Sequence, residues 1–169
     1  MATSRKCEKE WIDFFQSIYQ MHQNDIDYLM WHYETIKHFQ PKQGLELGFG
    51  WGFSAVGFLL GSKGNLISVD VDWEKQQYHG DIPINNQEKA ETEIKNEFAD
   101  RFSLYRTGVQ KFFQNVKHPK ADWLYIDTAH DHISVFRDFT LSIDSLKDDG
   151  ILCLDDYYRL HAVIDLYDE

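Results

Sequence analysis

The chain has 169 residues, of which 43% are hydrophobic and 15% aromatic, and its formal net charge at neutral pH is −11. This length and composition predict a single globular domain with a hydrophobic core. Because acidic residues are spread along the whole chain, its electric field would repel phosphate groups, which argues against a nucleic-acid partner.

The N-terminal sequence MATSRKCEKEW has no apolar run behind its basic residues, and no segment approaches the roughly 20 apolar residues of a membrane span. We therefore expect a chain that is neither exported nor inserted in a membrane. The two cysteines, Cys7 and Cys153, fit neither a disulfide framework nor a zinc site. This cysteine usage predicts a reducing, cytoplasmic compartment.

Two helices are predicted at the start of the chain. Residues 6–21 and 25–39 both place aromatic and aliphatic side chains at helical spacing, and Pro41 ends the second run. We expect residues 1–42 to form a helical cap ahead of a compact unit that spans residues 43–169.

From Gly44 onward, short apolar runs alternate with helical patterns. The runs are GLELG, NLISVDV, FSLYRT, DWLYID and GILCLDD, and the helix candidates are residues 52–61, 86–99, 108–116 and 131–147. This alternation predicts a Rossmann-like α/β fold with a doubly wound, mostly parallel sheet. Residues 73–86 form the least regular piece and are predicted to be a loop.

The ends of the predicted strands are the informative positions, because ligands of open parallel sheets bind outside the carboxyl ends of the strands. Four of the five ends carry an acid, and the remaining end carries a threonine and a glycine. In chain order these ends are Glu46, Asp70 with Asp72, Thr107 with Gly108, Asp127, and Asp155 with Asp156.

Three alternating glycines, Gly48, Gly50 and Gly52, occupy the first predicted strand-to-helix turn. Glycine lets the backbone bend tightly and come close to a ligand, because a Cβ would collide with it. In the dinucleotide fingerprint G-x-G-x-x-G the last glycine would fall where this chain has Phe53. The spacing therefore leaves a nicotinamide oxidoreductase as the less favoured interpretation.

The two acids beside this turn each allow two interpretations. Asp70 ends the second strand, where a carboxylate can accept hydrogen bonds from both ribose hydroxyls, although it could simply be a polar strand exit. Glu46 lies inside an apolar strand, and a buried carboxylate is costly without donors. Its donors would be backbone N–H groups of the turn or a cationic ligand without phosphate.

The motifs ELGFGWG and ISVDVD resemble the first two motifs of the class I S-adenosylmethionine-dependent methyltransferases. The resemblance implies an acid that orders the turn and faces the methionine end of the cofactor, and glycines that pass under the cofactor. It also implies an acid that binds the ribose and a short segment that lines the adenine pocket. The acid of the turn is Glu46, and the glycines are Gly48, Gly50 and Gly52. The ribose-binding acid is Asp70, and the adenine-lining segment is Gly108, Val109 and Gln110.

Three carboxylates end two neighbouring predicted strands, Asp127 the fourth strand and Asp155 with Asp156 the fifth. Adjacent strands lie about 5 Å apart, so these groups would converge, and their repulsion calls for a cation. Carboxylate oxygens suit Mg²⁺, Mn²⁺ or Ca²⁺. His130, shortly after Asp127, could accept a proton near neutral pH. The alternatives are a polar site without metal, a solvated turn, and a helix cap at His130 or Asp131.

The stretch YIDTAHDH, the helix after it and GILCLDDY resemble the metal-dependent small-molecule O-methyltransferases of the catechol and sugar-modifying types. By this resemblance Asp127, Asp155 and Asp156 are metal ligands, and His130 is the general base. Three residues depart from the family pattern and leave the ligand set intact: Thr128, His132 and Asp149.

The predicted activity is transfer of a methyl group from S-adenosylmethionine to a hydroxyl of a small molecule, with help from Mg²⁺ or Mn²⁺. The alternative is a non-catalytic S-adenosylmethionine-binding module, because family members continue after the fifth strand whereas this chain ends 13 residues after Asp156. We expect the fifth strand to be a sheet edge that the tail or a second subunit covers.

Overall fold

The computed structural model describes residues 6–19, 21–71, 84–129 and 131–155. The expected loop lies mainly outside these residues, and its last three positions belong to a helix instead. His130, Asp156 and Asp72 also lie outside the described residues.

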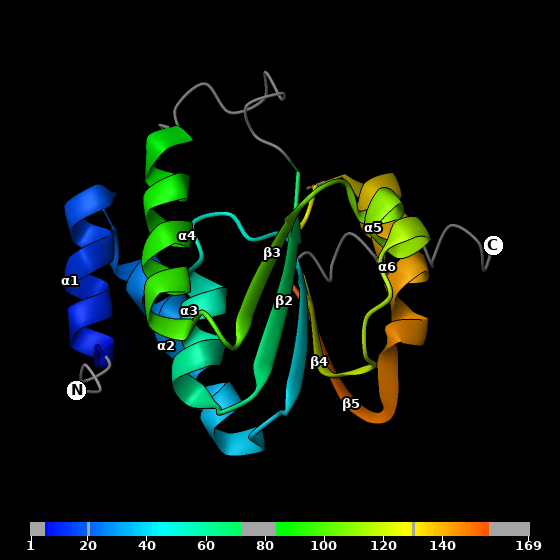
Figure 1. Ribbon diagram of the computed structural model, residues 1–169, viewed down its shortest axis with the longest axis horizontal. Coiled ribbons are helices and arrows are strands. Elements are labelled where there is room, and N and C mark those ends of the chain that lie inside the picture. The colour runs from blue at the N-terminus through cyan, green and yellow to red at the C-terminus, as the bar shows by residue number, and fades with distance from the viewer. Residues whose placement is uncertain (1–5, 20, 72–83, 130, 156–169) are drawn as a thin grey trace.

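Five parallel strands form one sheet with the order β3-β2-β1-β4-β5 (Figure 1). The predicted doubly wound parallel sheet is therefore confirmed. The strand order reverses between β1 and β4, which is where this class of sheet binds ligands. The strands are β1 (Gln43–Leu47), β2 (Asn65–Asp70), β3 (Phe102–Arg106), β4 (Ala121–Ile126) and β5 (Leu146–Leu154).

Helices cover both faces of the sheet (Figure 1). One face packs against α1 (Glu8–Ile18), α2 (Gln23–Phe39), α3 (Phe53–Gly61) and α4 (Ile84–Phe98), and the other against α5 (Val109–Asn115) and α6 (His132–Ser142). Strand side chains alternate between the two cores, as a pleated strand requires. Along β4, Trp123 and Tyr125 face the larger core, whereas Leu124 and Ile126 face the smaller one.

The two N-terminal helices share the core of the sheet rather than forming a separate layer. The Trp11 ring of α1 stacks on Phe98 of α4 at 5.9 Å, and Phe15 meets Phe53 of α3 edge-on at 4.7 Å. The second helix ends at Phe39, and its C-cap Gln40 adopts a left-handed conformation just before Pro41, as the proline predicted.

The last predicted helix, residues 131–147, is too long. Helix α6 ends at Ser142, a 3-10 turn covers Ile143–Ser145, and Leu146 already pairs with Ala121 as the first residue of β5. The spacing of apolar residues could not distinguish these states, because a 3-10 turn continues the helical pattern for one more step. A register irregularity follows in β5, so Ile151 pairs with Trp123.

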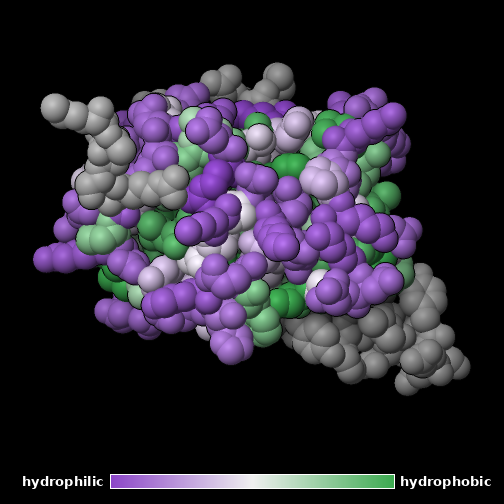
Figure 2. Space-filling view, turned by 60° about the horizontal axis from the view of Figure 1, so that its bottom comes forward, coloured by the Kyte–Doolittle hydropathy of each residue, from purple (hydrophilic) through white to green (hydrophobic). Residues whose placement is uncertain are grey.

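Strand β5 lies at one edge of the sheet, as expected. None of its nine residues is fully buried, in contrast to the interior strand β1. In the part of the chain that the structure describes, no helix is long and apolar enough to cross a membrane. The face shown in Figure 2 is mostly hydrophilic, and its hydrophobic residues lie in separate patches.

Candidate functional site

A cavity of about 940 Å³ opens at the carboxyl ends of the strands. Its walls come from the loop after β1, the ends of β2 and β4, the loop after β3, and the helices α2 and α6. This volume is within the usual range for small-molecule sites, and the position matches the predicted one beside the reversal of strand order.

The glycine turn forms one wall of this cavity. Gly48, Gly50 and Gly52 all have positive φ angles, of 97°, 50° and 84°. A Cβ on Gly48 would lie 1.7 Å from the carbonyl oxygen of Asp127, because β1 and β4 come together there. A Cβ on Gly50 would meet nothing within 4 Å. The alternating glycines therefore meet a backbone requirement that only glycine satisfies readily.

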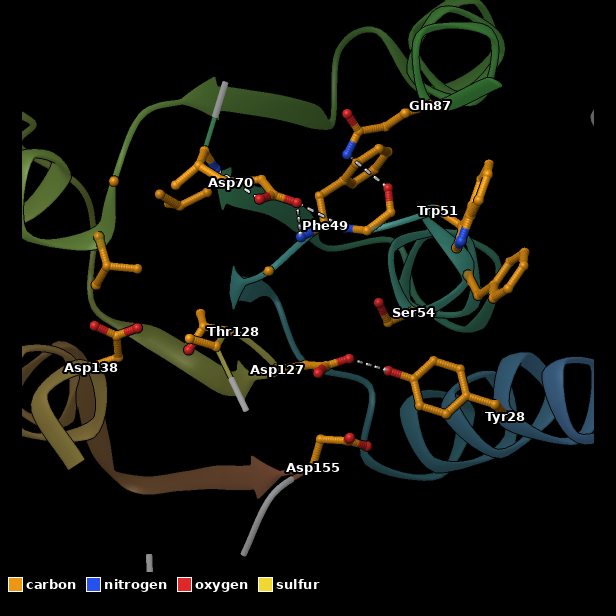
Figure 3. A pocket seen from close by; sticks show the side chains of 18 of the residues that line it. Tyr28, Phe49, Trp51, Ser54, Asp70, Gln87, Asp127, Thr128, Asp138 and Asp155 are labelled. Atoms are coloured by element: carbon orange, nitrogen blue, oxygen red, sulfur yellow. Dashed lines mark hydrogen bonds between the residues drawn. The ribbon is translucent and has the colours of Figure 1, made fainter. Parts of the chain in front are cut away.

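Asp70 holds the glycine turn in place. One of its carboxylate oxygens, Oδ2, accepts hydrogen bonds from the backbone N–H groups of Phe49 and Gly50, both at 2.9 Å (Figure 3). The other oxygen, Oδ1, accepts from the N–H of Val71 at 2.7 Å. Asp70 also lines the cavity, so the residue expected to bind a ribose lies at the predicted place and orders the turn as well.

A second support of the turn was not predicted. Gln87 of α4 is buried, and its Nε2 donates to the carbonyl oxygen of Gly50 at 2.9 Å. Arg106 at the end of β3 donates to Gln87 Oε1 at 2.9 Å and forms an ion pair with Glu91. No sequence signal marks Gln87, because it is one polar residue in a polar helical segment and its partners come from other elements.

Glu46 is fully buried under the turn, and its donors differ from those expected. Each of its carboxyl oxygens is hydrogen-bonded to a serine hydroxyl, one to Ser54 at 2.5 Å and the other to Ser68. Ser54 lines the cavity, whereas Glu46 is not among the lining residues. Burial raises the pKa of Glu46 to about 8, so this carboxyl is mostly protonated at neutral pH. The acid therefore ties β1, β2 and the start of α3 together.

Asp127 and Asp155 come together on the opposite wall, as their strand-end positions predicted (Figure 3). Both carboxylates lie near one hydroxyl group, since Tyr125 Oη is 3.3 Å from Asp127 Oδ2 and 3.4 Å from Asp155 Oδ1. Tyr28 of α2 donates to Asp127 Oδ2 at 3.1 Å. Tyr125 was not predicted to belong to the site.

The described residues contain only part of the predicted metal and proton-transfer set. Among them, no group of three or more His, Cys, Asp or Glu side chains could hold a metal ion, and the predicted ligand Asp156 and the predicted base His130 lie outside them. Asp127 and Asp155 fit a hard divalent cation in ligand type and in their convergence. Asp131 caps α6 by accepting from the N–H of Ser134 at 3.0 Å, so the helix-cap alternative holds for Asp131.

The segment expected to line an adenine pocket is divided between cavity and solvent. Gly108 and Val109 line the cavity, whereas Gln110 is exposed and is not among the lining residues. Thr128, which departs from the family glycine, lines the cavity next to Asp127, as Figure 3 shows. His132 is exposed at the start of α6.

A protein-family model described as a methyltransferase domain matches residues 45–157, which is most of the chain. The chain therefore belongs to this methyltransferase family. Its sheet, its glycine turn and the position of its cavity are those of the class I S-adenosylmethionine-dependent methyltransferase fold.

Solved methyltransferase structures share the fold at low sequence identity. The S-adenosylhomocysteine-bound methyltransferase PaMTH1 of Podospora anserina is 18% identical, with a TM-score of 0.64 over 85% of this chain and 60% of that one. The O-methyltransferase TomG of Streptomyces achromogenes, in complex with S-adenosylmethionine, is 14% identical, with a TM-score of 0.63 over 83% of this chain and 60% of that one.

An O-methyltransferase from Bacillus cereus, in complex with S-adenosylhomocysteine, is 19% identical, with a TM-score of 0.60 over 98% of this chain and 73% of that one. Identities this low establish the fold alone. This chain spans about 60% of the length of PaMTH1 and TomG. None of the curated proteins compared with this chain matches it.

Proposed function

We propose that this chain binds S-adenosylmethionine and transfers its methyl group to a hydroxyl of a small molecule. The observation that carries this proposal is a single cavity with two different walls. The glycine turn with Asp70 forms one wall, and the converging carboxylates of Asp127 and Asp155 form the other. The first wall suits a nucleoside, and the second suits the oxygen atom of an acceptor.

The cofactor would lie along the first wall. Gly50 leaves open space above the turn, where a side chain would otherwise meet a ligand. Asp70 faces the cavity as a carboxylate that can accept from ribose hydroxyls. Gly108 and Val109 would flank the adenine. Glu46 would act from beneath, through Ser54, by fixing where the turn begins.

The acceptor would lie between Asp127, Asp155 and Tyr28. In the proposed reaction the bond from the sulfonium sulfur to the methyl carbon breaks, a bond from that carbon to the acceptor oxygen forms, and the hydroxyl proton passes to His130. Asp127, Asp155 and Asp156 would hold a divalent cation, which would lower the pKa of the acceptor hydroxyl. The other residues of the cavity would align S-adenosylmethionine with the acceptor hydroxyl.

The charge of the acceptor wall supports a neutral, hydroxylated acceptor. Asp25, Asp127 and Asp155 all line the cavity there, and the whole chain carries a net charge of −11. A phosphate or carboxylate on the acceptor would be repelled by these groups. We therefore propose a sugar-like or natural-product-like hydroxyl compound as the acceptor and no nucleic acid.

Ligand binding gives the first test. S-adenosylmethionine and S-adenosylhomocysteine at about 100 times their dissociation constants are expected to raise the melting temperature by about 5 °C or more. NAD at the same concentration is expected to leave it unchanged. A shift with NAD alone would favour the nicotinamide oxidoreductase. Binding of both adenosyl ligands without turnover on any hydroxylated acceptor would favour the non-catalytic module.

Asp127→Asn is expected to lower turnover by about 100-fold, because it removes a carboxylate from the point where the acceptor oxygen reacts. Binding of S-adenosylhomocysteine should be nearly unchanged, since the glycine turn and Asp70 remain. Formation of S-adenosylhomocysteine with a panel of catechols and sugars would measure the effect.

Asp122→Asn is the matched control, because Asp122 lies at the other end of β4, where it pairs with Lys147. This variant is expected to lose a little stability and no turnover. Equal turnover of Asp127→Asn and the unchanged protein would contradict the assigned role of Asp127. A melting temperature that Mn²⁺ raises only when Asp127 is present would support the proposed metal ligands.

The exposure of the edge strand β5 is relevant to the oligomeric state of the protein. Its nine residues are half-buried or exposed, and such an edge is usually covered. We propose that residues 156–169 or a second subunit cover it. The molar mass in solution, measured by light scattering, would distinguish a monomer from a dimer.

A further inference from the structure

The hydroxyls of Tyr28 and Tyr125 form a connected group with the two aspartates of the acceptor wall. Tyr28 Oη and Tyr125 Oη are hydrogen-bonded to each other. Tyr28 Oη lies 3.1 Å from Asp127 Oδ2 (Figure 3). Tyr125 Oη lies within 3.4 Å of both Asp127 and Asp155. We call these four residues the tyrosine–aspartate group.

The tyrosines reach the aspartates from two different elements. Tyr125 and Asp127 are two positions apart at the end of β4, so their side chains leave the strand on the same face. Tyr28 comes from the N-terminal helix α2 and lines the cavity. The hydroxyl of Tyr28 therefore links the N-terminal helices to the acceptor wall.

The rings of both tyrosines are held by His32. Its imidazole is 1% exposed and packs edge-on against Tyr28 and Tyr125, each at 4.7 Å between ring centroids. Neither of its ring nitrogens has a hydrogen-bond partner among the described residues. Burial lowers the pKa of His32 to about 3, so it packs as a neutral ring. The hydroxyl ends of the tyrosines are therefore the parts left for polar contact.

Both phenols are neutral donors at physiological pH. A tyrosine hydroxyl keeps its proton at neutral pH. Two neutral O–H groups thus face two carboxylates. Two carboxylates side by side repel each other, and hydrogen bonds from neutral donors stabilise their charged forms.

We propose that the hydroxyls of Tyr28 and Tyr125 are positioning groups that hold Asp127 and Asp155 side by side in the acceptor site before any ligand binds. The consequence for turnover rests on the proposed methyl transfer, whereas the contact itself can be tested without any ligand. The Tyr125 hydroxyl lies within reach of both carboxylates and donates its one hydrogen to either of them, and Tyr28 contacts the Tyr125 hydroxyl and Asp127 from the helix side.

A double-mutant cycle on the ligand-free protein tests the contact. Tyr125→Phe is expected to lower the melting temperature by about 4–8 °C, because it removes the O–H that donates to a charged carboxylate. In an Asp127→Asn background the same substitution is expected to lower the melting temperature by less, since one of the two charged partners of Tyr125 is gone and only Asp155 remains. If Tyr125→Phe lowered the melting temperature equally in both backgrounds, the tyrosine would contribute by packing alone, and the proposal would be overturned.

Tyr105→Phe is the matched control. Tyr105 also lies in the sheet, on β3, and its hydroxyl forms no hydrogen bond with the described residues. Its replacement should change the melting temperature little and by the same amount in both backgrounds.

Turnover is the second readout, for which Tyr28→Phe is the mildest variant. It is expected to lower kcat about 5- to 10-fold and to leave the dissociation constant of S-adenosylhomocysteine unchanged. An unchanged kcat would overturn the positioning role. Absence of turnover in the unsubstituted protein would instead refute the proposed function, while the double-mutant cycle would still decide the contact.

Discussion

Gly48→Ala is expected to lower the free energy of unfolding by about 4 kcal/mol and to abolish binding of S-adenosylhomocysteine. The added Cβ would lie 1.7 Å from the carbonyl oxygen of Asp127, and its backbone φ of 97° is unfavourable for any side chain. Two backbone hydrogen bonds also fix this region. The Gly48 N–H donates to the carbonyl oxygen of Val69, and the Asp127 N–H donates to the carbonyl oxygen of Leu47. The clash can be relieved only if β1 and β4 separate.

Gly50→Ala separates the effect on folding from the effect on binding. Gly50 also has a positive φ, of 50°, but a Cβ there would meet no atom within 4 Å. This variant is expected to cost about 1 kcal/mol of stability and to weaken ligand binding, because the methyl group enters the cavity. Urea unfolding followed by circular dichroism, with calorimetric titration of S-adenosylhomocysteine, measures both. Similar stabilities for the two variants would contradict the close approach of β1 and β4.

The stability of the protein is expected to fall as the pH rises from about 6 to about 9, because of Glu46. Burial raises the pKa of this carboxyl from 4.5 to about 8, so in this range the folded protein keeps a proton that the unfolded chain has lost. The unfolded state binds fewer protons, and the free energy of unfolding then falls by up to about 1.4 kcal/mol per pH unit. Between pH 6 and 9 this loss amounts to about 3 kcal/mol, because the slope ends once Glu46 ionises in the folded protein.

Glu46→Gln should remove this slope. A glutamine can accept from one serine and donate to the other, so the contacts with Ser54 and Ser68 can be kept without a charge. The stability of the variant relative to the unsubstituted protein is expected to rise by about 3 kcal/mol between pH 6 and pH 9, because only the unsubstituted protein loses stability as Glu46 ionises. Differences between the two proteins at each pH cancel the contributions of other groups.

A surface acid provides the control for this experiment. Glu34→Gln is that control, because Glu34 lies on α2 with its side chain 62% exposed, and the variant should keep the fall in stability that Glu46 causes. His32 has the opposite effect at lower pH, because its pKa is lowered to about 3 and the unfolded chain takes up its proton first. Measurements above about pH 7 avoid this contribution. A stability that is flat or rising between about pH 7 and 9 would contradict the protonated state of Glu46.

The fold was largely readable from the sequence because its signals are local. Alternation of short apolar runs with helical spacing predicted the parallel sheet, and Pro41 predicted the end of α2. The predicted boundary between α6 and β5 was wrong, and the reason is again local. Leu146 continues the apolar spacing of the helix, and only its pairing with Ala121 assigns it to the strand.

The sequence predicted which residues lie at the candidate site, but not which groups they contact there. Asp70, Asp127 and Asp155 lie at the cavity because the ends of parallel strands meet at one edge of the sheet. The donors of Glu46 could not be predicted, because the loop N–H groups expected for it belong to Asp70 instead. Which of the two acids accepts hydrogen bonds from these N–H groups depends on how β2 and the turn approach each other.

The sequence by itself determined the element types, the parallel sheet and the side chains that end each strand, because hydrophobic period, turn residues and connection lengths are properties of neighbouring residues. Only the tertiary structure decided that Ser68 lies opposite Glu46, that Gln87 supports Gly50, and that Tyr28 reaches Asp127. These pairs join different elements, and their distances depend on strand register and helix docking. Packing of the whole core sets both, and no local pattern in the chain encodes them.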